Sequence, residues 1–278
     1  MHGWSDDGPD DDTFTHTVRI ADADRAVEVG VVATPSPAYA VRAVLCRALD
    51  GDVDPAVAAG LGRLVGTALA AGLTRRATEA AGDARGADFV VDAVVEAARL
   101  ARQVAKLPPE LAARAADRDA RECWQLDMTG WADLPDSCFT YSEAGRQLFG
   151  TRAIVTAITP DLYRPRPGQR KVFERRKVLR LERHGDRLVL LHSMHDNVHG
   201  FEVTYEIDAP TGRIVKAEHV TPRLPYLGIC SEPQRRIAAL LGETADAGLR
   251  KRIQAHLGGT AGCAQLYDLT ADALKLLA

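Results

Sequence analysis

Residues 64–100 read LVGTALAAGLTRRATEAAGDARGADFVVDAVVEAARL, and they align without a gap with residues 240–276, LLGETADAGLRKRIQAHLGGTAGCAQLYDLTADALKL. A glycine often marks a position where a helix ends or two backbones approach closely. Four glycines in one register therefore favour a tandem duplication over a chance match of alanine-rich helices. The aligned pairs are Gly66 with Gly242, Gly72 with Gly248, Gly82 with Gly258, and Gly86 with Gly262.

The similarity extends upstream into a pair of strands. Residues 27–29 align with residues 201–203, and residues 41–43 with residues 215–217. In the second copy EVTYEID (residues 202–208) alternates with period two and leads into a Pro-Thr-Gly turn, which predicts a β-hairpin. The sequence thus predicts an α+β fold of two diverged copies, each an antiparallel hairpin or meander followed by three helices. Additional strands within residues 151–194 predict the larger sheet in the second half.

Four parts follow along the chain. Residues 1–13 form an acidic segment that we expect to be a disordered tail. The first, degenerate repeat covers residues 14–106, and the second, with the extended sheet, covers residues 138–278. Residues 107–137 form a linker helix and a junction that contains Trp124 and Trp131. We expect these tryptophans to be buried for packing rather than to line a ligand pocket.

Composition limits the classes of function. The net charge is -3, so the whole chain has no field that draws it onto nucleic acid or an anionic membrane. No stretch approaches the roughly 20 uninterrupted apolar residues of a membrane span. The start MHGWSDDGPDDD is acidic where a signal peptide needs a basic start and an apolar run. We therefore expect a cytoplasmic protein with no membrane contact, and nucleic acid is the least favoured partner.

The cysteines favour neither disulfides nor zinc. Their number is odd, they lie far apart, and they include no CxxC pair. We expect free thiols, no bound metal and no cofactor. Two of them are candidate nucleophiles: Cys263, because a helix dipole at the start of the last helix would lower its thiol pKa, and Cys230, after a rigid turn. The alternative for both is a small residue buried at helix contacts.

The densest polar cluster lies in LLHSMHDNVHGFEV (residues 190–203). A turn at Asp196–Asn197 would bring the flanking His195 and His199 together. Imidazoles beside a carboxylate form a general acid–base pair, because histidine titrates near neutral pH and aspartate can fix its tautomer. The alternatives are hydrogen-bonded residues of a hydrated turn and, less consistent with the spacing, metal ligands. The candidate catalytic residues are His192, His195, Asp196, His199 and Glu202.

A basic run, LYRPRPGQRKVFERRKVLRLER (residues 162–183), precedes this cluster. Arginine offers bidentate donors to phosphate, sulfate or carboxylate, so the run predicts a site for an anionic substrate. The alternatives are an edge strand that its charges protect from aggregation and, third, a surface for nucleic acid. The candidate substrate-binding residues are Arg164, Arg166, Arg175, Arg176 and, in the turn that follows the hairpin, Tyr226.

Several of these motifs resemble the bacterial domain of unknown function 2889 family, over the final third of the chain. That family shows His-Asp-Met before a strand, a Pro-Tyr…Cys turn, and Gly-Cys-Thr-His-Leu at the start of the last helix. Here Gly200 replaces the Asp, and Ala264 and Gln265 replace the Thr-His. The resemblance implies a fold and no particular reaction. The matching residues are His199, Cys230, Gly262, Cys263 and Leu266.

The first copy differs at the same positions. Arg25 stands at the place of His199, and Ala87 at the place of Cys263, so we expect the first copy to be structural. For the second copy we expect a small-molecule enzyme, a lyase, cyclase or hydrolase that uses acid–base chemistry on an anionic substrate in bacterial specialised metabolism. The alternative is a noncatalytic module that binds a ligand or a protein. A homo- or hetero-oligomer is compatible with either function.

Overall fold

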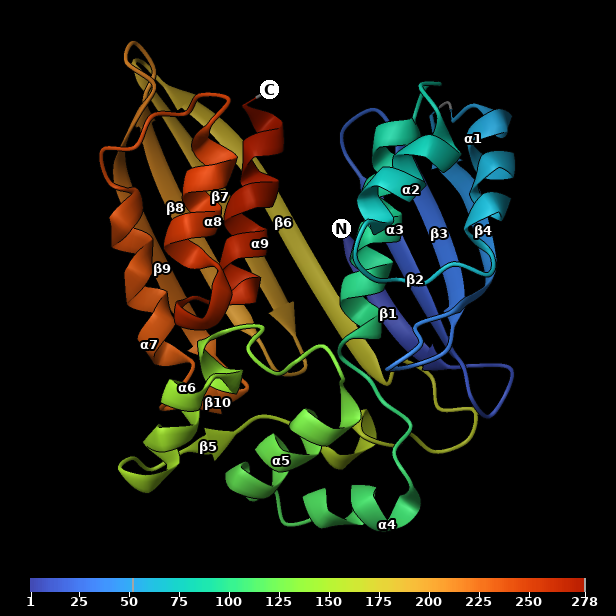
Figure 1. The fold of residues 1–278 in the computed structure, drawn as a ribbon. Helices are drawn as coiled ribbons and strands as arrows, with labels where there is room; N and C mark the ends of the chain where they lie inside the picture. The colour runs from blue at the N-terminus through green and yellow to red at the C-terminus, as the bar shows by residue number, and fades with distance from the viewer. Residues whose placement is uncertain (52, 278) are drawn as a thin grey trace. The chain divides into compact units, whose positions relative to one another are not determined.

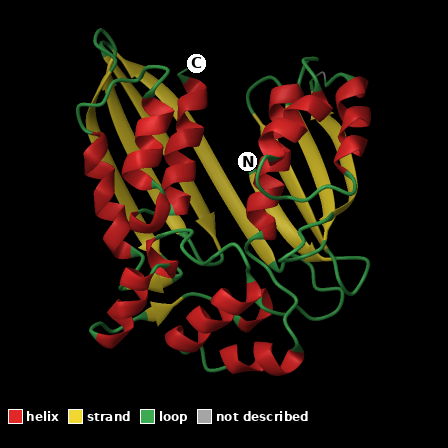
Figure 2. Ribbon diagram, in the orientation of Figure 1, coloured by secondary structure: helices red, strands yellow, loops and turns green. Residues whose placement is uncertain are grey.

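The computed structural model describes residues 1–51 and 53–277, and the chain folds into two compact α+β units. The first unit contains residues 1–116, 129–132 and 159–175, and the second contains residues 117–128, 133–158 and 176–278. Each unit has an antiparallel sheet with helices packed on one face (Figures 1 and 2). The α+β fold expected from the sequence is confirmed.

In the first unit the strands are ordered β4-β3-β2-β1, followed by the first residues of β6 (Phe173–His184). Val27, Val29 and Val31 alternate along β3 and are fully buried. The three helices that follow the sheet are α1 (Pro55–Gly60), α2 (Leu73–Ala81) and α3 (Ala87–Ala101). The strands are β1 (His2–Asp7), β2 (Phe14–Ala21), β3 (Ala26–Ala33) and β4 (Val41–Asp50).

The acidic N-terminal segment is ordered, in contrast to the disordered tail expected from its composition. Residues 2–7 form β1 and pair with β2. Ser5 is fully buried, and its Oγ lies 2.8 Å from Nδ1 of His16. The carboxylate of Asp6 accepts a hydrogen bond from the backbone N of Lys171 at 2.7 Å and pairs with Arg170 at 3.1 Å. Arg170 is a distant partner that local composition does not reveal, and it compensates the charge of Asp6.

In the second unit the strands are ordered β6-β7-β8-β9. They comprise β6 from residue 176 onward, β7 (Arg187–Asp196), β8 (Gly200–Asp208) and β9 (Arg213–Arg223). The helices α7 (Ser231–Gln234), α8 (Leu249–Leu257) and α9 (Ala264–Ala273) follow. The sequence predicts the larger sheet in the second half. Each unit has four long strands, so the second sheet is larger in the length of its strands and not in their number.

The remaining segments complete the two units. The segment expected to be a linker is divided: Trp124 packs in the second unit, edge-on to Phe149, and Trp131 packs in the first, edge-on to Tyr163. The further elements are α4 (Pro109–Ala112), α5 (Ala120–Gly130), α6 (Glu143–Gln147), β5 (Val155–Thr156) and β10 (Tyr226–Leu227), and the 3-10 turns η1 (Leu61–Leu64), η2 (Ala113–Ala115), η3 (Phe139–Tyr141), η4 (Leu148–Gly150), η5 (Pro160–Leu162), η6 (Arg235–Leu240), η7 (Gly259–Ala261) and η8 (Leu274–Leu276).

One glycine pair of the aligned segments has the same role in both units. Gly66 has a φ of 83° and donates its N–H to the carbonyl of Val41 at 2.9 Å. Gly242 has a φ of 85° and donates to the carbonyl of Ile214 at 2.8 Å. Both φ values lie in the left-handed region that favours glycine. In each unit this bond joins the loop after the first helical segment to the start of the last strand.

An arginine repeats this correspondence one helix later. Arg76 of α2 donates to the carbonyl of Ala68 at 2.7 Å, and Arg252 of α8 donates to the carbonyl of Thr244 at 2.5 Å. The other aligned glycines differ in backbone conformation. Their φ values are positive in the first unit, at 78°, 70° and 86° for Gly72, Gly82 and Gly86, and negative in the second, at -86°, -96° and -111° for Gly248, Gly258 and Gly262.

Candidate functional site

The turn between β7 and β8 forms around one aspartate. Asp196 Oδ1 accepts the backbone N–H groups of Val198 at 2.8 Å and His199 at 2.6 Å, and the Asp196 N–H donates to the carbonyl of His199 at 2.9 Å. A short carboxylate that accepts backbone donors two and three residues ahead stabilises such a turn. The turn therefore contains residues 196–199, and β8 begins at Gly200.

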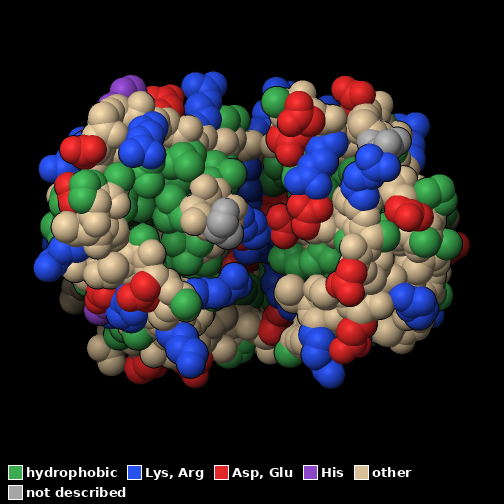
Figure 3. Space-filling view, turned by 90° about the horizontal axis from the view of Figure 1, so that it is seen from above, with side chains coloured by type: hydrophobic (Ala, Val, Ile, Leu, Met, Phe, Trp, Pro, Cys, Tyr) green, Lys and Arg blue, Asp and Glu red, His purple; other side chains and the backbone are tan. Residues whose placement is uncertain are grey.

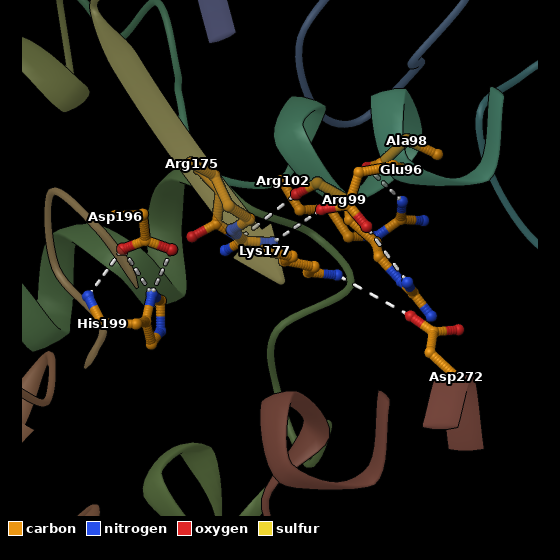
Figure 4. A network of polar contacts seen from close by, with 10 residues as sticks. Glu96, Ala98, Arg99, Arg102, Arg175, Lys177, Asp196, His199 and Asp272 are labelled. Carbon is orange, nitrogen blue, oxygen red and sulfur yellow. Dashed lines mark hydrogen bonds and ion pairs between the residues drawn. The ribbon is translucent and has the colours of Figure 1, made fainter. Parts of the chain in front are cut away.

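The same carboxylate holds the imidazole of His199. Nδ1 of His199 lies 3.0 and 3.1 Å from the two carboxylate oxygens of Asp196 (Figure 4). The Asp196 side chain is fully buried and that of His199 is 9% exposed, so bulk water screens this pair weakly. A proton on Nδ1 satisfies the carboxylate and leaves the lone pair of Nε2 for proton exchange. Asp196 thus orients His199 as the sequence predicts.

His195 and Glu202 lie on the other face of the sheet. Residues 190, 192, 194 and 196 of β7 are buried, whereas His195 alternates with them and its side chain is 42% exposed. Its Nε2 lies 3.4 Å from Oε1 of Glu202, whose side chain is 59% exposed. The expected juxtaposition of His195 with His199 is therefore not formed. His195 pairs with Gly200, and not with His199, because the turn contains four residues.

The helix-covered face of the same sheet holds two further polar side chains. Nδ1 of His192 lies 2.8 Å from the carbonyl oxygen of Leu269 in α9, which occupies one ring nitrogen in helix packing. Lys177 of β6 is buried, and its Nζ lies 3.8 Å from Oδ2 of Asp272, also in α9. Lys177 is thus a buried cation on the strand next to β7.

The first unit contains the same turn with a different cation. Asp22 Oδ1 accepts the N–H groups of Asp24 and Arg25, each at 3.0 Å, and the Asp22 N–H donates to the carbonyl of Arg25 at 3.0 Å. Nε of Arg25 pairs with the Asp22 carboxylate at 3.2 Å. Its two terminal nitrogens pair with Asp88 at 2.8 and 2.9 Å. The first copy therefore has an arginine ion pair where the second has the histidine–aspartate contact.

The predicted anion-binding arginines are dispersed. Arg164 donates to the carbonyl of Leu107 at 2.7 Å, and fully buried Arg175 pairs with Glu96 at 3.4 Å, both inside the first unit. Arg166 is exposed in the first unit, and Arg176 is exposed in the second. The interactions of Arg164 and Arg175 indicate structural roles. Three of the four arginines belong to the first unit and Arg176 to the second, so neither unit by itself contains the predicted anion site.

Tyr226 is a buried donor. Its hydroxyl donates to Oδ2 of Asp127 at 2.5 Å, and the hydroxyl of Tyr141 donates to the same oxygen at 2.7 Å. Burial raises the pKa of Tyr141 well above its ordinary value, so this hydroxyl stays protonated. This cluster connects α5, η3 and β10, and it directs Tyr226 toward the interior of the unit.

Burial disfavours the thiolate form of both candidate nucleophiles. Cys263 caps α9, and its Sγ accepts the Leu266 N–H at 3.5 Å, yet burial outweighs this hydrogen bond and raises the thiol pKa to about 11. Sγ of Cys230 lies 3.0 Å from Oγ1 of Thr140, and burial raises its thiol pKa as well. Thiolate is the reactive form of cysteine, so the structure does not support an activated nucleophile at either position at neutral pH.

Some residues of the site region escaped the sequence reasoning. Tyr226 contacts Asp127 and Tyr141, and Cys230 contacts Thr140. These partners lie about a hundred residues earlier in the chain, and no local sequence pattern predicts such contacts. The Asp22 turn could have been found, because the alignment that places Arg25 over His199 also places Asp22 over Asp196. Among the described residues, no group of three or more histidine, cysteine or acidic side chains is placed to hold a metal ion.

Fold and site together define a two-unit α+β protein whose second unit carries a histidine–aspartate pair in a hairpin turn. Residues 182–277 match the family model described as "Protein of unknown function (DUF2889)", which confirms the resemblance over the final third of the chain. The match runs from the end of β6 to the end of the last helical segment. The comparisons found no matching curated protein and no matching solved structure.

Proposed function

We propose that the second unit is a small-molecule enzyme in which His199 transfers protons. The observation that carries this proposal is the contact of His199 Nδ1 with both oxygens of buried Asp196. A carboxylate that fixes the tautomer of an imidazole and stabilises its protonated form is a recurrent arrangement in general acid–base catalysis. Isomerisation, elimination with ring closure, and hydrolysis are the reaction classes that one such group serves.

We further propose an anionic substrate. Lys177 is the charged group best placed to support this, because it is buried on the helix-covered face, where Asp196 also lies. A substrate carboxylate or phosphate would pair with Nζ of Lys177 in competition with the acidic side chains around it, of which Asp272 lies 3.8 Å away. In this proposal Lys177 takes the role that the sequence suggested for Arg175 or Arg176.

The replacement His199→Arg tests the catalytic role, because it gives the second turn the residue of the first. The arginine should keep the contact with Asp196 and therefore the fold, but it cannot exchange protons near neutral pH. We expect turnover to fall about 100-fold or more, and urea unfolding checks that the variant keeps its fold with Ala264 at the position of Asp88. The substrate for this assay is found by thermal-shift screening of small carboxylates and phosphate monoesters, followed by product detection by NMR.

The matched control is Arg25→His, which makes the converse change in the first unit and should leave turnover unaltered. Equal turnover in His199→Arg and the unchanged protein would contradict the proposal.

Lys177→Met should raise KM for the anionic substrate more than it lowers kcat, since its proposed role is binding.

A noncatalytic binding module is the second candidate, and the turn of the first unit favours it. Arg25 shows that this turn accommodates a cation that pairs with the carboxylates of Asp22 and Asp88 and stacks on the ring of Phe89. Under this alternative His199→Arg would retain ligand-induced stabilisation in full, and no compound of the panel would be converted.

We also propose that the two units descend from a tandem duplication. The shared turns at Asp22 and Asp196, the matched bonds of Gly66 and Gly242, and the matched arginines of α2 and α8 support it. The first copy then lost the titratable residue and kept the fold. For the enzyme activity of the second unit, we propose that it takes place in the cytoplasm and serves bacterial specialised metabolism.

Among the described residues, no helix is both long and apolar enough to span a membrane. On the face seen in Figure 3, basic and acidic side chains are interspersed over each unit and do not gather by sign. A continuous basic stripe, which nucleic-acid binding would require, is not seen on that face.

A further inference from the structure

The outer strand of the first unit has an exposed edge. Within residues 1–51 and 53–277, β4 has β3 as its only sheet neighbour, and at its start Val41 bonds the loop at residues 66–67. The ten residues VRAVLCRALD leave Leu45 77% exposed and Leu49 43% exposed. An edge strand with unpaired backbone groups and apolar side chains is a template for pairing with another strand.

The corresponding strand of the second unit is protected. β9, the other edge strand, carries Lys216, Glu218, Pro222 and Arg223, and Lys216 pairs with Glu206 and Glu218 on its own sheet. Charges and proline are the usual protection of an edge, and β9 has both although it also exposes Val220. β4 lacks proline, and its central residues 44–46 are uncharged.

We propose that β4 pairs antiparallel with β4 of a second copy of this chain. When two copies of one strand pair antiparallel about a two-fold axis, the two residue numbers of every pair add to the same sum. Paired residues lie on the same face of the sheet, and residues on one face are two apart, so this sum must be even. The sum of 92 places Arg42 opposite Asp50 of the copy, and Leu45 opposite Arg47. The neighbouring sum of 90 would pair each of these charged residues with alanine.

This register suits each side chain that it covers. Leu45 is more exposed than Leu49, and the aliphatic stem of Arg47 from the second copy would cover it. The guanidinium of that Arg47 would keep its 2.7 Å contact with Glu28 of its own chain. Two Arg42–Asp50 pairs would close the ends of the ladder. Cys46 would lie on the two-fold axis, opposite its own equivalent, with its thiol half-buried.

Sedimentation of the full chain over a range of concentrations tests this surface. We expect a reversible dimer. Leu45→Lys should raise the dimer Kd about tenfold or more, and Arg42→Asp should raise it about threefold. Combining Arg42→Asp with Asp50→Arg should restore the original Kd, because the opposed charges are exchanged. Val220→Lys, an equally drastic change at an exposed valine of β9, is the matched control and should leave the Kd unaltered.

Cross-linking checks the register independently. A short bis-maleimide should join two chains through Cys46, and Cys46→Ser should abolish the covalent dimer. A chain that stays monomeric at its highest soluble concentration would overturn the proposal. So would a dimer that Val220→Lys disrupts and Leu45→Lys does not.

Discussion

Replacing Glu96 by alanine is expected to lower the free energy of unfolding of the first unit by about 3–5 kcal/mol. Glu96 is buried in α3, with Oε1 3.4 Å from Arg175 and Oε2 3.1 Å from Arg99. Arg175 is fully buried and cannot lose its proton to escape the cost of burial. Removing Glu96 takes away this carboxylate partner of Arg175. Urea unfolding of the variant, followed by circular dichroism, measures the loss.

The reverse replacement should cost less. Arg175→Met removes the buried charge and leaves Glu96 its contact with Arg99. The double variant Glu96→Leu/Arg175→Met should recover most of the stability lost in Glu96→Ala, since an apolar pair of similar volume often replaces a buried ion pair without loss. If Glu96→Ala and Arg175→Met were equally harmless, the structural role assigned to Arg175 would be incorrect.

Acidification is expected to destabilise the first unit through His16. This imidazole is fully buried against Ser5, and burial lowers its pKa from 6.5 to about 3. Between these values the unfolded chain binds a proton that the folded chain does not, so stability falls as the pH falls below 6.5. The loss should reach about 3 kcal/mol at pH 4, at about 1.4 kcal/mol per pH unit.

Two variants isolate this contribution from that of the carboxylates. His16→Gln removes the titrating group and should flatten the stability curve between pH 6.5 and pH 4 by the same amount, while Ser5→Ala should keep the slope. Hydrogen exchange of the β1 and β2 amides assigns the effect to the first unit. A slope in His16→Gln that matches the unchanged protein would show that His16 titrates normally in the folded state.

The sequence is most informative where local pattern and turn chemistry agree. The three helices expected after each hairpin are present, and the hairpin from β8 to β9 follows the period-two pattern of EVTYEID. Turn residues and alternation are local signals that need no tertiary partner. The acidic strand β1 was missed because its stability depends on His16 and on residues near 170, far along the chain.

The sequence predicts the turn that contains Asp196, but it does not predict which distant residues contact the other candidate site residues. Asp196 and the turn were expected, and its carboxylate holds His199. His195 could have been placed by alternation, since it follows Met194 and precedes Asp196, both buried. The contacts of Tyr226 with Asp127, and of Arg175 with Glu96, join residues separated by 99 and 79 positions. Only the tertiary fold determines such pairs.

The tautomer of His199 tests the central claim most directly. Nitrogen-15 NMR of the imidazole side chains, in mildly alkaline buffer with His199→Arg to assign the signal, reports which nitrogen carries the proton. The account predicts a proton on Nδ1, held by Asp196, and an unprotonated Nε2. Protonated Nε2 with bare Nδ1, or a tautomer mixture that Asp196→Asn leaves unchanged, would contradict it.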